Sequence, residues 1–446
     1  MINLHIPIIQ CIITNKQLFI INMIKYILFT TSLLVSFNAD NDKNELFSNI
    51  DAVQEETTIK SIKIYKTGDE LSNPIIELGS KETITLTFDD LSDNSSNYSY
   101  SIVHCNSEWD ESGLISSDYM DGFEPNSLTN SQNSVGTTIP YMHYSLELPN
   151  NDVKIKISGN YLVKVFDTYN STRVVVERRF RVVESLVSIN ARIIQPIDPS
   201  YKSTSQQLEL SIKYSPLKIS NPYTDLTVEI FQNSQPINSV HRLQPTFIKN
   251  DEITYSTSNQ PIFDGVNEFR SFDLNTFRYI SLGVSSIEQI GSEYSVQLQP
   301  SENNRAQKYF NKTDKNGSYI IKLANSELSN IEADYAWIYF TLPYYDQLPE
   351  KEVYVVGELT DWQCSPQNMM QYNYQRQAYE LRMYLKQGYY NYRYVVKDIK
   401  TGTLDQTFFE GNHSETENDY LFLVYYKQQG DRYERLVGMK KLNTRN

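Results

Sequence analysis

Residues that bind transition metals are scarce in this sequence. Its 446 residues include only 3 Cys and 5 His, whereas a metal site needs three or four ligands that converge on one point. Common catalytic signatures are missing as well: there is no G-x-S-x-G elbow, no P-loop, no H-E-x-x-H and no C-x-x-C. We therefore expect no metal, no cofactor and no enzymatic activity.

Positive charge is in the minority. The chain has 40 Lys and Arg against 54 Asp and Glu, which gives a net charge of -14. Nucleic acids and anionic lipids are themselves polyanions, so this balance argues against nucleic acid as a partner. No apolar run reaches the roughly 18 residues that a membrane-spanning helix needs, so we also expect no insertion into a membrane.

Tyrosine, in contrast, is abundant. With 34 Tyr and 19 Phe the aromatic content is 13%, and aromatic side chains favour pleated, half-buried surfaces. Apolar and polar residues alternate around Ile62 and Ile64 and again through Ile84, Leu86 and Phe88, which is the pattern of half-buried strands. The sequence therefore predicts an all-β protein of tandem immunoglobulin-like β-sandwich domains.

The first 39 residues have the features of a secretory signal peptide. They contain Lys16 and Lys25 but no acid, an apolar stretch follows Lys25, and the sequence turns polar after Ala39. We predict cleavage close to Ala39, with Met23 as a possible true start of the chain. The alternative is a first core strand, which these flanking residues disfavour.

Turn residues and changes in composition divide the rest of the chain. We predict a flexible lead-in over residues 40–58, an N-terminal β-sandwich over 59–185, a second β domain over 186–343, a third domain over 344–427 and a C-terminal tail over 428–446. Cys105 and Cys364 then lie in different domains, so two free thiols are expected in preference to a disulfide.

Several side chains with possible chemistry have a simpler interpretation. The acid pairs Asp89 with Asp90 and Asp118 with Asp121 could bind calcium or take part in acid–base catalysis, but solvated carboxylates in turns are far more common. We predict solvated turns for both pairs. His104 has no second ligand at a suitable spacing, so we expect a packed or surface histidine.

Charged and aromatic residues alternate near residue 270. In a strand, Glu268 and Arg270 would share one face, about 7 Å apart at the backbone. We predict that they form a structural ion pair near a strand edge, partly buried against Phe269 or Phe272, rather than a catalytic group.

Two segments of the predicted third domain carry a resemblance. Residues 355–362 are VVGELTDW and residues 388–396 are GYYNYRYVV. Both resemble the early-set immunoglobulin-like domains that accompany glycogen- and starch-active proteins. The resemblance leaves an alternative function open, which is binding of an α-glucan with Trp362 as the stacking platform. A structural role for Trp362 is the favoured interpretation.

Six motifs occur in order along the chain. They are LSNPIIEL at 71–78, LTFDDL at 86–91, IVHCNSEW at 102–109, YMDGF at 119–123, SGNYLVKV at 158–165 and NEFRSFD at 267–273. Together they resemble the plug protein family of the Bacteroidetes type IX secretion system, over roughly residues 59 to 426. One departure is Val266, where a second Gly is expected. The motif residues taken as structural or interface positions are His104, Cys105, Trp109, Asp121, Gly122, Phe123, Asn267, Glu268, Phe269, Arg270 and Asp273.

This resemblance implies a role without catalysis. Plug proteins lie in the periplasm, peripheral to the outer membrane, and occlude the translocon at its periplasmic mouth. The resemblance therefore implies a periplasmic protein, monomeric in isolation, whose partner is the outer-membrane translocon β-barrel. It supplies no active site to carry over.

Overall fold

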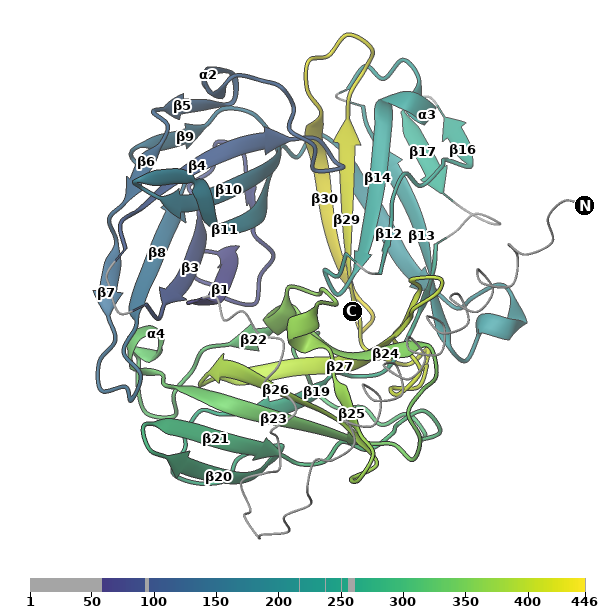
Figure 1. Cartoon of the computed structure of the whole chain (residues 1–446). Coiled ribbons are helices and arrows are strands. Elements are labelled where there is room, and N and C mark those ends of the chain that lie inside the picture. Colours follow the sequence, from purple (N-terminus) through teal and green to yellow (C-terminus); the bar gives the residue numbers. More distant parts are fainter. Residues whose placement is uncertain are drawn as a thin grey trace, which may run out of the picture. The chain divides into compact units, whose positions relative to one another are not determined.

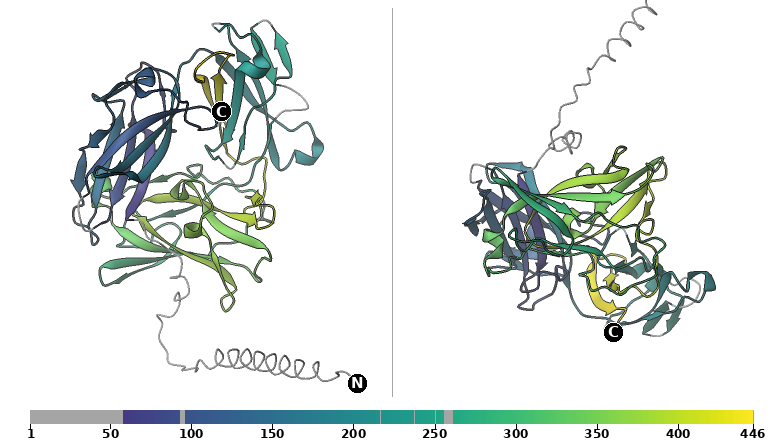
Figure 2. Two further views of the ribbon diagram at one scale, coloured as in Figure 1. Left: turned by 45° about the horizontal axis from the view of Figure 1, so that its top comes forward. Right: turned by 90° about the horizontal axis from the view of Figure 1, so that it is seen from below.

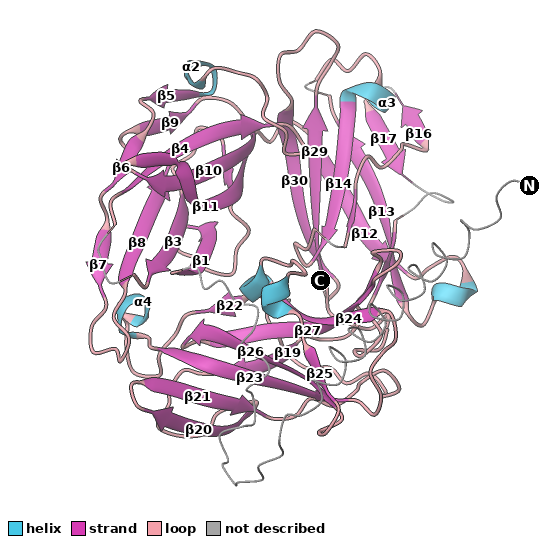
Figure 3. Ribbon diagram, in the orientation of Figure 1, coloured by secondary structure: helices cyan, strands magenta, loops and turns pink. Residues whose placement is uncertain are grey.

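The computed structural model describes residues 58–92, 96–215, 217–236, 238–249, 251–255 and 261–445. The predicted signal peptide, and all but the last residue of the predicted lead-in, lie outside these residues. Strands dominate the described part, and its helices are single short turns (Figure 3). The predicted all-β fold class is therefore confirmed. Among the described residues, no helix has the length and apolar character needed to cross a membrane.

Two sheets form the first sandwich (Figure 1). Their orders are β1-β3-β8-β7 and β2-β11-β10-β4-β6. The strands are β1 (Ile59–Lys66), β2 (Ile75–Glu77), β3 (Ile84–Asp90), β4 (Tyr98–Cys105), β6 (Asn126–Leu128), β7 (Ser131–Asn133), β8 (Met142–Leu148), β10 (Gly159–Asp167) and β11 (Asn170–Val183), with β5 (Met120–Gly122), β9 (Val153–Ile155) and α2 (Ser116–Tyr119) beside them. Leu86 and Phe88 of β3 pack with Tyr161 of β10 in one buried cluster, so the alternating pattern of β3 faces the opposite sheet.

The second sandwich combines distant parts of the chain. Its sheets have the orders β12-β13-β17-β16, with β18 also paired to β13, and β15-β14-β29-β30. The strands are β12 (Ser188–Ile194), β13 (Ser205–Lys213), β14 (Leu226–Gln232), β15 (Ser239–Val240), β16 (Phe247–Lys249), β17 (Glu252–Tyr255), β18 (Ile262–Asp264), β29 (Asp419–Tyr426) and β30 (Arg435–Asn443), with η3 (Pro199–Tyr201) and α3 (Pro222–Asp225) between them. Figure 2 shows the last two strands, in yellow, next to the teal strands of this sandwich.

The third sandwich also combines separate segments. One sheet has the order β20-β21-β23-β26-β25, and in the other β27 pairs with β19, β22, β24 and β28. The strands are β19 (Arg270–Asp273), β20 (Val284–Ile290), β21 (Glu293–Leu298), β22 (Tyr319–Ile320), β23 (Tyr335–Pro343), β24 (Lys351–Val356), β25 (Gln371–Asn373), β26 (Ala378–Lys386), β27 (Tyr389–Asp398) and β28 (Leu404–Asp405), with α4 (Ser329–Glu332), η4 (Glu358–Thr360) and η5 (Pro366–Asn368) between them.

The strand pairing departs from the predicted domain division. The predicted boundary at 343/344 separates β23 from β26, yet these strands pair along their whole length. Strand β29 falls in the predicted third domain and β30 largely in the predicted tail, yet both complete the sheet of β14. Turn signals locate the ends of strands, but they carry no information about which strand pairs with which. Only the first sandwich is built entirely from one predicted range, 59–185.

Candidate functional site

The motif IVHCNSEW, at residues 102–109, contains a histidine with a buried ring. His104 of β4 is 1% exposed, and its Nε2 lies 3.2 Å from the carbonyl oxygen of Ser158. The rings of Tyr161 and Tyr433 meet it edge-on, with centroids 5.1 and 5.7 Å away. Burial lowers the pKa of His104 to about 4, so the imidazole is neutral at neutral pH. A Cβ at Gly159, where φ is +143°, would lie 2.3 Å from Nε2, so this position requires glycine.

The two described thiols are unreactive. Cys105 and Cys364 are both free, which confirms the predicted absence of a disulfide between them. Burial raises the pKa of each thiol to about 11. The nucleophilic form of cysteine is the thiolate, so neither side chain is activated for nucleophilic chemistry at neutral pH.

Trp109 lies where the first sandwich meets the second. Its ring lies 4.5 Å from the guanidinium of Arg179 and 4.9 Å from that of Arg181. Arg181 in turn lies over the ring of Phe231 in β14 and donates from Nε to the hydroxyl of Tyr425 in β29, at 3.2 Å. The motif tryptophan is therefore part of a junction between two sandwiches.

The YMDGF motif lies on the two-stranded sheet of the first sandwich. Asp121 is exposed and lies 3.3 Å from the ammonium of Lys156, as a solvated carboxylate would. A Cβ at Gly122, where φ is +137°, would lie 1.9 Å from the carbonyl oxygen of Asp152, so glycine is required. Phe123 is 86% exposed. Phe123 therefore presents a large apolar surface to solvent.

Arg270 does not pair with Glu268, so that prediction is wrong. Strand β19 begins at Arg270, and Val266 has a φ of +57°, so the two side chains do not share the face of one strand. The Nε of Arg270 donates to both carboxylate oxygens of Glu410, at 2.9 and 3.0 Å. Burial by itself would lower the pKa of Arg270. The neighbouring Glu410 carboxylate outweighs burial, so the pKa of Arg270 is raised above its usual value.

Glu268 has other partners. Its Oε1 accepts from the hydroxyl of Tyr309 at 2.5 Å and from the backbone N–H of Glu417 at 3.2 Å, and lies 3.5 Å from Arg445. Burial raises the pKa of Glu268. The side chain of Asn267 donates to the carbonyl oxygen of Glu410 at 2.9 Å. The motif thus binds the segment that leads into β29 and joins the second sandwich to the third.

Two further motif positions are structural. The carboxylate of Asp273 accepts from the backbone N–H of Asn275 at 2.9 Å, and so fixes the turn that follows β19. The ring of Phe269 lies 3.6 Å from the guanidinium of Arg393 and meets Trp362 edge-on at 5.9 Å. Trp362 is half-buried and packs against the cluster of Tyr354, Val356 and Val395. This packing supports the favoured structural role of Trp362, and the alternative of glucan binding stays a prediction.

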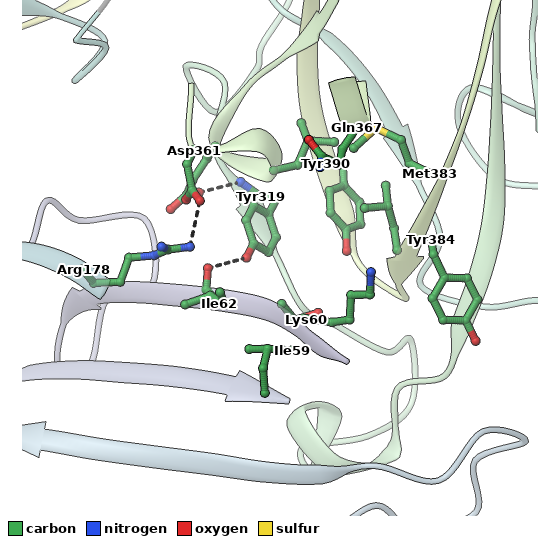
Figure 4. Close-up of a pocket in the computed structure, with 14 residues that line it drawn as sticks. Ile59, Lys60, Ile62, Arg178, Tyr319, Asp361, Gln367, Met383, Tyr384 and Tyr390 are labelled. Carbon is green, nitrogen blue, oxygen red and sulfur yellow. Dashed lines mark hydrogen bonds and ion pairs between the residues drawn. The ribbon is translucent and has the colours of Figure 1, made fainter. Parts of the chain in front are cut away.

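A cavity of about 300 Å³ lies between the first and third sandwiches (Figure 4). Across it, Arg178 of β11 lies 2.8 Å from Asp361, and the hydroxyl of Tyr319 donates to the carbonyl oxygen of Ile62 at 3.3 Å. Beside it the ammonium of Lys63 lies 3.5 Å from Glu358. Burial raises the pKa of Glu358, while Lys63 opposes that shift. Charged pairs therefore bridge this junction.

A fully buried carboxylate lies at the same junction. One oxygen of Asp89 lies 2.5 Å from the ammonium of Lys386 and 2.7 Å from the hydroxyl of Tyr335, and the other lies 2.6 Å from Nδ1 of His143. Asp89 is 0% exposed and Asp90 2%, so the prediction of a solvated turn is wrong for this pair. Burial lowers the pKa of Lys386, against the effect of the neighbouring Asp89.

Sequence reasoning missed this cluster because its members come from strands far apart in the chain. The one available signal was two adjacent acids at the end of the otherwise apolar-alternating strand β3. Within the described residues, no group of three or more His, Cys, Asp and Glu side chains is placed to hold a metal ion. Of the motif residues, Trp109 thus lies at the junction of the first and second sandwiches, and Asn267, Glu268 and Arg270 contact the segment that joins the third sandwich to the second.

Comparison with known protein families gives a match whose bounds are close to those of the first sandwich. The family model described as Type 9 secretion system plug protein 1st domain matches residues 59–184. The crystal structure of a hypothetical protein from Parabacteroides merdae ATCC 43184 is similar, with a TM-score of 0.84 and 33% sequence identity over 87% of this chain and 98% of that chain. No curated protein matches the chain.

Proposed function

Because the chain belongs to the plug protein family of the type 9 secretion system, we propose that it closes the outer-membrane translocon of that system from the periplasmic side. In this proposal the protein is a non-catalytic stopper. It is exported by its signal peptide, stays peripheral to the outer membrane, is monomeric alone and binds the translocon β-barrel.

The observation that carries the proposal is the way the matched sandwich is fixed to the rest of the chain. Asp89 and Lys386 form a buried ion pair between the first and third sandwiches. Arg435 of β30 forms two hydrogen bonds, at 2.8 and 2.5 Å, with Glu184 after β11. Each pair bridges two sandwiches, the first fully buried and the second partly exposed, and a stopper must keep its shape.

The chemistry of the buried groups also supports a binding role. His104 is neutral and enclosed by aromatic rings, and both described thiols have raised pKa values. These groups pack in the interior, and their shifted pKa values do not favour acid–base catalysis or nucleophilic attack at neutral pH.

Two experiments test the proposal. Affinity-tagged protein from detergent-solubilised outer membranes should co-purify with a very large barrel protein. Cells that lack this protein should become permeable to a large hydrophilic antibiotic such as vancomycin, and expression of the full chain should restore the barrier. Retention of the barrier without the protein, together with no co-purifying barrel, would reject the function.

A further inference from the structure

Edge strands are the places where another polypeptide can add to a sheet, because one side of their backbone has N–H and C=O groups without partners. Most edge strands in the described part of the chain are very short. Five are longer, namely β1, β12, β20, β24 and β30.

Four of these five strands have another part of the chain close beside them. Three of these four accept a hydrogen bond from a residue that does not belong to the strand paired with them. The acceptors are the carbonyl oxygens of Ile62 in β1, Val353 in β24 and Leu436 in β30, at 3.3, 2.8 and 2.9 Å. Strand β12 packs beside β30. The contact of β12 with β30 is made by side chains, since a Cβ at Gly438 of β30 would lie 3.4 Å from the Cδ1 of Ile189. Each of these four strands therefore has another part of the chain close beside it.

Among the described residues, no strand or helix other than β21 packs closely beside strand β20. It is the outermost strand of its sheet and pairs with β21 alone (Figure 1). Across the residues that the structure describes, no backbone hydrogen bond joins residues 285–290 to anything other than β21. Its sequence, VSSIEQI, contains no Lys and no Pro, the residues that commonly protect an edge. Its one irregularity, a register shift between Val284 and Ser286, lies at one end.

Exposed apolar side chains flank this edge at both ends. The loop before β20 presents Tyr279, Ile280 and Leu282, which are 60%, 60% and 54% exposed, and Ile290 at the other end is 63% exposed. The loop is fixed in place, since the backbone N–H of Asp273 donates to the carbonyl oxygen of Leu282 at 2.9 Å. An open strand edge and exposed apolar residues thus coincide.

We propose that β20 is a docking edge to which an extended segment of a partner protein adds as one more strand of the sheet. A row of alternating N–H and C=O groups is satisfied by an extended polypeptide, whereas a helix, a lipid or a glycan cannot match it. The identity of the partner as the translocon rests on the proposed function, but strand addition itself does not.

The side chains of β20 indicate what kind of segment fits. Ile287 packs against the core of the third sandwich, whereas Glu288 is exposed on the opposite face. An added strand places its side chains alternately on these two faces. The segment should therefore alternate apolar with polar residues, with Lys or Arg beside Glu288.

Site-specific photo-crosslinking in intact cells tests this geometry. A photo-reactive phenylalanine replaces Ser285 or Gln289 of β20, one at a time in the full chain, and Gln132 of the exposed three-residue strand β7 is the control. Crosslinks from the two β20 positions should map to one partner segment, about four residues apart. Crosslinks scattered over different segments, or no stronger than those from Gln132, would overturn the proposal.

Charge on the edge provides a second test. The variant Ser285→Lys/Gln289→Lys should weaken association with the crosslinked partner at least about tenfold, because Lys on an edge opposes strand addition. The control Gln132→Lys should bind as the wild type does. Unchanged binding of the double variant would overturn the proposal. A crosslinked segment from a protein other than the translocon would support strand addition and reject the proposed partner.

Discussion

Arg270 is an example of how single residues are stabilised in this protein. Its guanidinium is held by Glu410, which lies 140 positions further along the chain, and Glu268 is held by Tyr309 and Arg445. Removing such charges from water is costly, and the cost is offset only while the partner is present. The largest effects of substitution are therefore expected where one member of a buried pair is removed.

Arg270→Met should lower the free energy of unfolding by roughly 3–5 kcal/mol, because Glu410 is left buried without its cation. Arg192→Met is the matched control, since Arg192 is 72% exposed and its pair with Glu209 lies at the surface. That change should cost less than about 1 kcal/mol. Urea denaturation measures both. Equal small losses would contradict the assignment of Arg270 to a buried pair.

Gly159→Ala should destabilise the protein more than Gly68→Ala does. Both glycines have positive φ, but a Cβ at Gly159 meets the His104 ring, whereas a Cβ at Gly68 meets nothing within 4 Å. The difference should be about 1–3 kcal/mol, the usual cost of overpacking. Thermal unfolding of the two variants measures it, and identical stabilities would show that the His104 ring can move aside.

His104 should make stability depend on pH. Its pKa is about 4 when folded against 6.5 as the ordinary value, so the unfolded chain takes up a proton first as the pH falls. The stability due to neutral His104 is complete above about pH 6.5 and is lost as the pH falls toward 4, about 3 kcal/mol in all. Urea denaturation at pH 7 and pH 4.5 should show a smaller loss for His104→Phe than for the wild type. Equal losses would argue against a buried neutral ring.

Strands of different sandwiches contact one another through polar groups. Strand β3 contributes Asp89, β8 contributes His143, and β26 contributes Lys386 on the other side of the junction. The side chains of Asp89 and Lys386 are each 1% exposed, and that of His143 is 12% exposed. The junction is therefore specific, and its net contribution to stability depends on how well the charges compensate their lost hydration.

A double-mutant cycle tests this junction. Lys386→Met should cost roughly 3–5 kcal/mol, because the carboxylate of Asp89 loses its buried cation. Asp89→Leu/Lys386→Met should recover part of that loss, because the buried carboxylate and its ammonium are removed together, while His143 and Tyr335 lose a hydrogen-bond partner. Urea denaturation of both single variants and the double variant gives the coupling energy. Additive losses would indicate that the two side chains do not interact.

The whole molecule is not a row of consecutive domains. The sheet of β14 is completed by β29 and β30, and the sheets of the third sandwich use segments on both sides of residue 343. Among the strands that the structure describes, those of the first sandwich alone lie in one continuous range. Fragments of the chain should therefore differ in whether they fold and unfold cooperatively.

A fragment of residues 58–185 should fold alone and unfold cooperatively, because both of its sheets are complete. A fragment of residues 344–427 should stay unfolded, because β26 would lack β23 and β29 would lack β14. Circular dichroism and urea denaturation of both fragments are the measurement. Cooperative unfolding of the second fragment would contradict the observed strand pairing.

The sequence by itself determined the local features. Alternation in β3 and the aromatic content predicted strands, six ordered motifs indicated the family, and the distance between Cys105 and Cys364 predicted free thiols. The strands follow from neighbouring residues, and the family and the free thiols follow from the order and spacing of short segments along the chain. The partners of Arg270 and Asp89, the burial of Asp89 and the pairing of β14 with β29 were decided by the tertiary structure. The physical reason is that strand order and buried charge pairing depend on residues far apart in the sequence, 140 positions for Arg270 with Glu410 and 297 for Asp89 with Lys386, which periodicity does not connect.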